Sequence, residues 1–521
     1  NVASLLLARA MAREQELALR SALGADRGKL IRLLLTESVV LFVAGGTLGM
    51  LVASWGVNAL RSFGLSGLPR AFDVRLDGTM LGLTLLCALG AGLLFGLLPA
   101  VSASRGDAAG ALKEAGARGS AGRRTQRLRS VLVVTEIALA VMLLSTAALL
   151  IKSFGRLEAQ NPGFDPDHVV TARVDLPDRK YDSPQKKTAF HDAVVAALER
   201  QPGVIAVGAT DVLPFIPGNF NQGSYSSPDL VLPPGSPQPH GRIHDVDIGY
   251  RRALGLTLLR GRWFNDTDRL GGRNVCVVDQ LLVDHDWPGQ DVIGKRIVRG
   301  TGGPGTAPAA TIVGVVAPIR TEGLDQPLGK ETIYFPLDQG RGDFSTFVIR
   351  TSRPTASAAA AIRAAVREAD PDLSVFDLKT MNERMDDIVQ PRRAPMVLLS
   401  LFGALALLLA ALGVYGVLAF SVTQRRVEFG IRFALGATGR DIAGLVLTQA
   451  AQLVVIGIVA GLAGYLALSR VVGQLLFDVS AVDPAMLLVA PAVLALAAFL
   501  ATLLPVRRAT QSDPMIALKA E

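Results

Sequence analysis

Six long apolar stretches constrain the fold of this chain more than any other feature of its sequence. A hydrocarbon core about 30 Å thick requires about 20 apolar residues in a helix that crosses it. Hydrophobic residues make up 50% of the 521 residues and charged residues only 19%, whereas about a quarter of the residues in soluble domains are charged. A wholly soluble enzyme is therefore excluded. The predicted membrane spans cover residues 33–60, 80–101, 131–151, 396–420, 442–468 and 486–504.

Cationic residues between the spans predict how the chain is oriented in the bilayer. The net charge is +8, which in a soluble chain would suggest nucleic-acid binding. In a membrane protein, an excess of Lys and Arg marks the cytoplasmic loops. The basic segments 9–29, 105–129, 425–440 and 507–519 all fall on one side if every span crosses. We therefore expect these segments in the cytoplasm, the segment 153–392 outside, and no nucleic-acid partner.

The segment predicted to lie outside shows the pattern of a mixed α/β domain. Alternating apolar residues predict strands at 169–176, 204–212, 346–351 and 373–379, with amphipathic helices at 184–199 and 356–369. Two β-α-β units that flank an insert predict one split subdomain with a second subdomain inserted into it. The insert, about 217–343, contains short β-like runs at 275–278 and 311–316 and is expected to be mainly β. The predicted fold class is thus an α-helical integral membrane protein with a large extracytoplasmic α/β domain.

A polar motif occurs twice, 412 residues apart. Glu16, Arg20, Leu23 and Gly24 recur as Glu428, Arg432, Leu435 and Gly436, and each copy is followed by an apolar span. The two halves also end alike, because Asp107 and Leu112 correspond to Asp513 and Leu518. Similarity between two Leu-rich helices would not reproduce these polar positions, so the repeat indicates an internal duplication.

Each copy of the motif predicts a short helix, a tight turn and a membrane span. Glu428 and Arg432 have the spacing and order that favour an ion pair on a helix. Gly24 and Gly436 suit a left-handed C-cap, and Asp26 and Thr438 can cap the helix that follows. The motif is interpreted as an element that docks onto another protein at the cytoplasmic face. The alternative is an interfacial helix that only anchors the adjoining span.

The chain resembles permeases of the MacB/FtsX superfamily, which are membrane subunits of ABC-type machines, and in particular the duplicated permeases with two units in one polypeptide. The residues that carry the resemblance are 16–25, 428–437, Leu112, Leu518, Gly249, Tyr250, Leu254, Gly255, 260–262, 312–316 and 333–336. In that family each unit has a first span, a large extracytoplasmic domain and three further spans. The apolar start at Asn1, without Met, is interpreted as the end of a span whose beginning is absent, so the chain is expected to be truncated at its N-terminus.

The resemblance implies a domain organisation. Residues 1–113 would form the C-terminal part of a first FtsX-like unit, and residues 114–129 a basic cytoplasmic linker. Residues 130–152 would form the first span of the second unit, 153–392 a MacB-like periplasmic core domain, and 393–521 the rest of the second unit with three spans. The protein would cross a bacterial cytoplasmic membrane several times.

The resemblance also implies a function and partners. A separate ABC ATPase dimer would bind the two motif copies, so that Glu16, Arg20, Leu23, Gly24, Glu428, Arg432, Leu435 and Gly436 form an ATPase-coupling motif. ATP hydrolysis would then move the extracytoplasmic domain, in efflux or mechanotransmission. The lipid bilayer, a periplasmic adaptor and an outer-membrane exit protein are further expected partners. The alternative is a regulatory membrane protein whose outer domain controls an envelope enzyme or senses a ligand.

Motifs for catalysis or cofactor binding are not convincing in this sequence. Residues 289–296 match a phosphate-binding loop except that Arg296 replaces the Ser or Thr that ligates Mg²⁺. His240 and His244 lack the helix and the glutamate of a zinc protease site and are interpreted as polar surface. The tripeptide 341–343, Arg-Gly-Asp, is interpreted as a turn. We expect no catalytic residues, no metal and no cofactor.

Overall fold

The computed structural model describes residues 27–62, 77–104, 121–216, 218, 221–301, 308–339 and 344–510. The chain divides into two compact units. Asn1–Arg156 and Pro391–Glu521 form the helical unit, and Leu157–Gln390 form the α/β unit. Both connections between the units are helical, since α6 (Ala121–Glu158) and α11 (Met381–Gln424) each extend across the division. The assignment of the two units to membrane and exterior, with boundaries at 153 and 392, stays a prediction.

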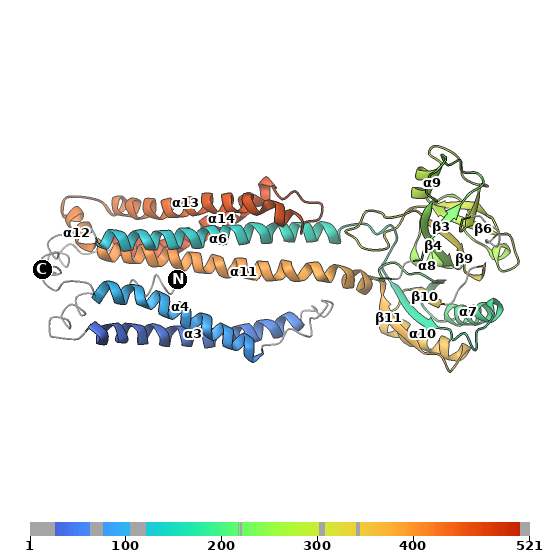
Figure 1. Ribbon diagram of the computed structural model, residues 1–521, viewed down its shortest axis with the longest axis horizontal. Helices are drawn as coiled ribbons and strands as arrows, with labels where there is room; N and C mark the ends of the chain where they lie inside the picture. Colours follow the sequence, from blue (N-terminus) through green and yellow to red (C-terminus); the bar gives the residue numbers. More distant parts are fainter. Residues whose placement is uncertain are drawn as a thin grey trace. The chain divides into compact units, whose positions relative to one another are not determined.

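The described part of the helical unit consists almost entirely of long apolar helices (Figure 1). Besides α6 and α11 these are α3 (Arg27–Ser62), α4 (Gly78–Ser104), α13 (Gly439–Gly473) and α14 (Pro484–Thr510), and α12 (Arg426–Ala434) is a short one. Within the described residues, five helices are long and apolar enough to cross a membrane: α3, α6, α11, α13 and α14. Five of the predicted spans are thereby confirmed as helices of spanning length. The sixth falls in α4, whose described apolar part is the shorter segment Gly78–Leu93.

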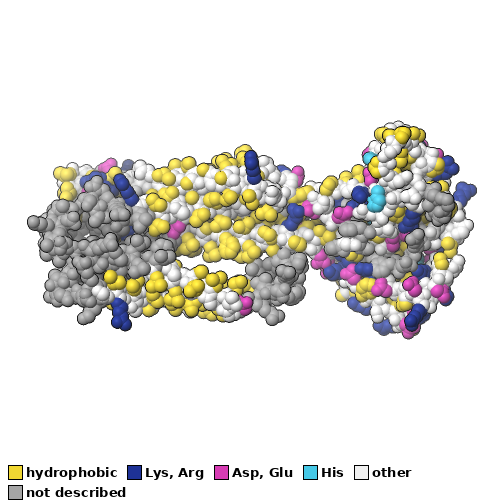
Figure 2. All heavy atoms as spheres, in the orientation of Figure 1, with side chains coloured by type: hydrophobic (Ala, Val, Ile, Leu, Met, Phe, Trp, Pro, Cys, Tyr) yellow, Lys and Arg dark blue, Asp and Glu magenta, His cyan; other side chains and the backbone are white. Residues whose placement is uncertain are grey.

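Helices α6, α11, α13 and α14 pack around one apolar core. Ile137, Val414, Ile442 and Leu494, one from each helix, are at most 1% exposed within it. A Cβ atom added at Gly457 of α13 would lie 2.4 Å from Ile137 Cγ2. Because lipid is as apolar as the helix surfaces, the hydrophobic effect does not drive helices together inside a membrane. Close approach at a small residue such as Gly457 instead stabilises the bundle through van der Waals contacts. Large apolar side chains cover the outward surface of these helices (Figure 2), as expected for lipid contact.

The split subdomain of the α/β unit is a four-stranded antiparallel sheet with two helices on one face (Figure 1). The strand order is β11 (Val375–Thr380), β1 (Val169–Asp175), β10 (Phe344–Thr351), β2 (Val204–Thr210). Helices α7 (Pro184–Glu199) and α10 (Thr355–Ala369) bury Val194 and Ile362 against Phe347. This is the ferredoxin-like arrangement of two β-α-β units, so the prediction of a split subdomain is confirmed. Strand β2 ends two residues earlier than predicted because Thr210 Oγ1 accepts a hydrogen bond from Val212 N and turns the chain.

The inserted subdomain is mainly β, as predicted. Its strands are β3 (Gln222–Ser226), β4 (His240–Val246), β5 (Leu258–Gly261), β6 (Val275–Asp279), β7 (Arg296–Arg299), β8 (Ala310–Val316) and β9 (Thr332–Pro336). The order β4-β3-β7-β8-β6-β9 closes on itself, because β9 also pairs with β4 in parallel, and β5 pairs with β8. Tyr225, Trp287 and Ile312 are buried in its core. Helices α8 (Tyr250–Leu254) and α9 (Gln280–Asp286) and the 3₁₀ turns Asp266–Asp268 and Leu337–Gln339 complete it.

Candidate functional site

The second copy of the repeated motif folds as the predicted helix, turn and helix. Helix α12 ends at Ala434, and Gly436, two residues later, has a φ of +94°, the left-handed conformation that glycine adopts without strain. Gly436 N donates to Phe433 O at 3.0 Å and Ala437 N to Arg432 O at 2.9 Å, which is the Schellman pattern of helix termination. The C-cap predicted at Gly436 is confirmed. The first copy, with Glu16, Arg20, Leu23 and Gly24, lies outside the described residues.

A capping box starts the helix that follows this turn. Thr438 N and Thr438 Oγ1 both donate to Asp441 Oδ2, at 2.8 and 2.7 Å. The N-cap predicted at Thr438 is therefore confirmed. Since only Leu435 to Thr438 separate α12 from α13 and all are fixed by hydrogen bonds, α12 is joined to α13 by a short, ordered turn.

Glu428 lies at the centre of a three-residue charge cluster. Its carboxylate accepts hydrogen bonds from Arg425 Nε and Arg425 Nη2, both at 2.7 Å, and forms an ion pair with Arg432 Nη2 at 2.7 Å. The Arg425 hydrogen bond, followed by the positive charges of both arginines, outweighs partial burial and lowers the pKa of Glu428. The cluster thus carries one net positive charge with all three side chains held in place. The predicted pair Glu428–Arg432 is present.

Arg425 was missed as a site residue by the sequence reasoning. It precedes α12 and provides the bidentate half of the cluster, and its guanidinium carbon lies 5.4 Å from the centroid of the Phe429 ring. The available signal was the repeat itself, because Arg13 stands 412 residues earlier at the corresponding position.

Helix α12 has two apolar sides. Phe429 is 1% exposed and packs into the core of the bundle, with Phe433 against the same core. Val427, Ile431 and Leu435 are 42%, 48% and 82% exposed. Residues four apart lie on one face of a helix, so these three side chains form a continuous apolar stripe, which we call the α12 stripe. A stripe of this kind beside a fixed positive charge is suited to contact a protein surface.

An open groove lies next to α12 along the first turns of α13. Its volume is about 710 Å³. Ser421 donates to Gln449 Oε1 at 3.0 Å beside it. The lining is polar and includes both positive and negative groups: Arg425, Arg440, Asp441, Gly444, Leu445, Thr448, Gln449 and Gln452.

The other sequence motifs have structural surroundings that do not form a site. Residues 289–296 connect α9 to strand β7, whereas a phosphate-binding loop leads into a helix. Lys295 Nζ donates to Gln290 Oε1 at 2.6 Å. His240 is exposed as predicted, but the prediction of a polar surface is wrong for His244, which the pairing of β4 inside the sheet buries against Tyr334, with ring centroids 5.5 Å apart. Among the described residues, no three His, Cys, Asp or Glu side chains are grouped so as to hold a metal ion. Residues 341–343 lie outside the described part of the chain.

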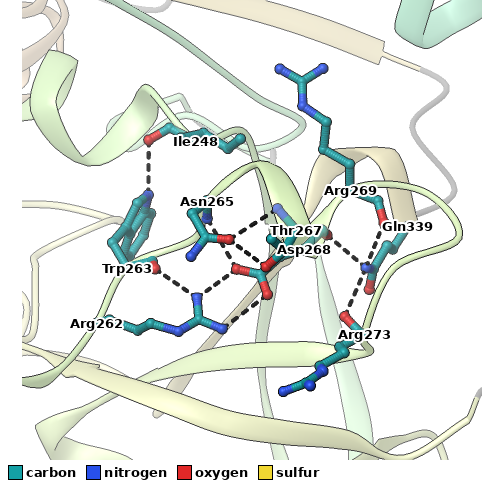
Figure 3. Close-up of polar contacts among 9 residues, drawn as sticks. All are labelled: Ile248, Arg262, Trp263, Asn265, Thr267, Asp268, Arg269, Arg273 and Gln339. Carbon is teal, nitrogen blue, oxygen red and sulfur yellow. Dashed lines mark hydrogen bonds and ion pairs between the residues drawn. The ribbon is translucent and has the colours of Figure 1, made fainter.

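The polar residues around 260–273 stabilise a loop of the inserted subdomain (Figure 3). Arg262 forms a bidentate pair with the buried Asp268, at 2.6 and 3.0 Å. Gln339 Nε2 donates to the carbonyl oxygens of Asp268, Arg269 and Arg273. Trp263 Nε1 donates to Ile248 O at 3.1 Å. Because these groups satisfy one another, Arg262 contributes to the fold of this loop.

Gly249 and Tyr250 likewise have a packing role. A Cβ atom added at Gly249 would lie 1.9 Å from Val207 O, and one added at Gly208 would lie 2.4 Å from Tyr250 Cα. Only glycine allows β2 and the start of α8 to approach so closely. The outer motif therefore marks the α/β fold, and α12 is left as the candidate functional site.

Two models of known protein families match this chain, and together they cover parts of both units. The model of the FtsX-like permease C-terminal domain matches residues 1–108 and 400–514, and that of the MacB-like periplasmic core domain matches residues 130–368. The chain belongs to the MacB/FtsX superfamily of ABC transporter permeases. Members of this superfamily are membrane permease components.

Curated relatives share the superfamily at modest identity. The chain is 27% identical over 313 residues to the macrolide export ATP-binding/permease protein MacB of Chromobacterium violaceum, covering 56% of this chain and 47% of that protein. It is 26% identical over 288 residues to MacB of Agrobacterium fabrum, covering 53% and 43%. It is 27% identical over 277 residues to the pyoverdine export ATP-binding/permease protein PvdT of Pseudomonas putida, covering 50% and 40%. The chain thus spans less than half the length of these relatives.

A solved structure also aligns with part of the MacB/FtsX chain. The extracellular domain of the noncanonic ABC-type transporter YknZ from Gram-positive bacteria covers 40% of this chain and 100% of its own, at 15% identity. The TM-score is 0.28.

Proposed function

We propose that this chain is the permease subunit of an ABC-type efflux or mechanotransmission complex in a bacterial cytoplasmic membrane. It couples ATP hydrolysis by a separate ATPase dimer to movement of the extracytoplasmic domain, residues 153–392, which contains the α/β unit. The observation that carries the proposal is the α12 stripe, which is exposed, apolar and fixed beside the Arg425–Glu428–Arg432 cluster.

The ATPase contact is assigned to α12 on two grounds. The predicted topology places residues 425–440 in the cytoplasm, where ATP is available. The relatives are named as ATP-binding/permease proteins, while the family models matched here are the permease and periplasmic core domains. The coupling residues are Glu428, Arg432, Leu435 and Gly436, with Glu16, Arg20, Leu23 and Gly24 in the other half.

The helix connections suggest how motion would pass through the protein. The turn at Gly436 and the Thr438 cap join α12 to α13 without a flexible linker. Closure of the ATPase dimer would therefore displace α13 together with the docked α12. A periplasmic adaptor or exit protein would respond to the resulting movement outside the membrane.

Reconstitution of the chain with its ATPase in lipid vesicles tests this function. Leu435→Asp and Ile431→Asp place a charge in the α12 stripe and are expected to weaken ATPase binding about tenfold or more, as charges at the core of interfaces do. Leu435→Met, which keeps an apolar side chain, is the matched control. Wild-type binding and ATPase stimulation in both aspartate variants would contradict the docking role of α12.

A further inference from the structure

The end of α6 that leads into the α/β unit is held by the loop between α13 and α14, residues 474–483. Ser153 Oγ accepts a hydrogen bond from Phe477 N at 2.7 Å and donates to Phe477 O at 3.2 Å. Lys152 forms an ion pair with Asp483. Arg156 donates to the carbonyl oxygen of Asp478 and lies 3.4 Å from its carboxylate. We call these contacts the α6 clasp.

The loop is itself fixed to both helices that it connects. Tyr465 of α13 donates its hydroxyl hydrogen to Ala481 O at 2.6 Å. Asp483 Oδ1 accepts from Ala485 N at 3.1 Å and Met486 N at 3.3 Å, so the carboxylate caps α14 with one oxygen while the other pairs with Lys152. The Lys152 hydrogen bond, joined by the cap, lowers the pKa of Asp483.

An apolar cluster supports these polar contacts. Leu149 of α6 and Tyr465 of α13 are at most 1% exposed, with Val472 beside them. Met486 and Leu487 of α14 pack against the same cluster. Three helices therefore meet at one rigid junction.

The junction lies directly before the α/β unit in the chain, at the far end of α13 from α12. The α/β unit begins at Leu157, directly after the last clasp residue, Arg156. At its other end α13 begins after the turn from α12, and its 35 residues span about 50 Å. A displacement of α12 would thus reach the clasp through one continuous helix.

We propose that the α6 clasp is a positioning element that transmits movement of the α13–α14 hairpin to α6 and so to the α/β unit. This inference rests on the proposed function. It assigns Lys152, Ser153 and Asp483 to the transmission of force, with the ATPase contact left to α12. Without the clasp, the chain would still bind the ATPase, but the α/β unit would no longer move in response to ATP.

Two variants break the ion pair from opposite sides. Lys152→Met removes the ammonium but keeps a long side chain. Asp483→Ser removes the carboxylate but keeps a residue that caps helices well. Arg470→Met, which removes an exposed cation from the same end of α13, is the matched control, and Lys152→Arg is the conservative variant expected to retain function.

The measurement uses the full chain with its ATPase in lipid vesicles. Spin labels at Val231→Cys and Ala467→Cys, two exposed positions, report the distance between the units, with Cys87→Ser removing the exposed native thiol. ATP is expected to shift the distance distribution in the wild-type background. Lys152→Met and Asp483→Ser are expected to reduce the shifted fraction about fivefold or more, a usual allosteric coupling, without weakening ATPase binding. The double variant is expected to lose no more than either single variant.

The possible failures are distinguishable. A shift of wild-type size in both single variants, with the ATPase bound, would overturn the clasp and leave the proposed function standing. An absence of any shift in the wild-type background would overturn the proposed function and the transmission role together. If the variants lose thermal stability so that the ATPase no longer binds while Lys152→Arg behaves in the same way, the contacts are structural only and the inference is wrong.

Discussion

At the scale of single residues, the charge cluster on α12 shows which contacts the sequence motif predicted and which it did not. The i, i+4 spacing predicted Glu428–Arg432, and the pair is present at 2.7 Å. The spacing did not predict the stronger bidentate partner Arg425, because Arg425 lies before the helix and its direction depends on the turn from α11. The repeat positions of Arg13 and Arg425 were the better guide.

Glu428→Gln is expected to affect coupling more than stability. The three side chains are 35–40% exposed, and ion pairs of that exposure contribute about 0.5 kcal/mol or less each. The melting temperature should therefore change little, while stimulation of the ATPase falls because the two arginines lose their fixed positions. Thermal unfolding and ATPase assays on the same preparation check this. A large drop in melting temperature would assign the cluster a structural role.

His191 gives the α/β unit a pH-dependent stability. Its ring is buried, stacks on Phe347 and lies 3.4 Å from Asp247 and 3.5 Å from Asp192. Burial lowers its pKa, but the two carboxylates outweigh burial and raise it to about 9. Since the folded pKa exceeds the value of about 6.5 in the unfolded chain, the stabilisation is fully present below pH 6.5 and is lost as pH rises through 9.

The contribution of His191 to the free energy of unfolding should thus fall by about 3 kcal/mol between pH 6 and pH 9.5. His191→Gln should remove this contribution, leaving the part of the slope that comes from the buried carboxyls Asp211 and Asp279, whose pKa values burial raises to about 7. Fluorescence of Trp263 and Trp287 in the full chain, with Trp55→Phe to remove the helical-unit signal, reports unfolding of the α/β unit. Equal slopes in wild type and His191→Gln would show that another group titrates.

At the scale of elements, apolar pattern predicted the helices and strands but not which side of α12 faces outward. Phe429, Ile431, Phe433 and Leu435 alternate in sequence, so no single buried face is evident from their spacing. The division between buried Phe429 and exposed Ile431 is made by packing against α13 and α14, which is tertiary. For the same reason the closure of the inserted subdomain was not predicted. The parallel pairing of β4 with β9 places Arg242 opposite Thr332, 90 positions later in the chain, and no feature of the local sequence indicates this pairing.

The contact of α13 with α6 should be sensitive to a single methyl group. A Cβ atom at Gly461 would lie 2.7 Å from Val141 Cβ and from Ala138 O. Gly461→Ala is therefore expected to separate the helices and to destabilise the bundle by about 1–3 kcal/mol, the usual cost of overpacking. Gly444→Ala is the matched control, because open space surrounds that position in the same helix. Melting temperatures in detergent compare the two, and an equal loss in both would implicate backbone effects in place of packing.

At the scale of the whole molecule, the sequence predicted two kinds of unit and their order, while the orientation across the bilayer depends on charge alone. Basic residues such as Arg440 and Arg507 lie at one end of α13 and α14, and Lys152 and Arg470 lie at the opposite ends of α6 and α13. The second pair is partly neutralised, since Lys152 is paired with Asp483. The positive-inside rule therefore favours the end that carries α12 as cytoplasmic.

This orientation can be measured with a thiol reagent that does not cross membranes. Val231→Cys is expected to react in intact cells, because residue 231 is 94% exposed and the α/β unit is predicted outside. Leu435→Cys, at a position 82% exposed on α12, is expected to react only after the membrane is opened. Both variants use a Cys87→Ser background, and Cys276 is buried, so unintended labelling is limited. Reaction of Leu435→Cys in intact cells would place α12 outside the cytoplasm, where the proposed ATPase cannot reach it, and would end its assignment as the ATPase contact. If only Val231→Cys reacts in intact cells, the bilayer lies between α12 and the exposed site on the α/β unit. Any coupling between α12 and the α/β unit must then cross the bilayer, and α6 and α11 run from one unit into the other.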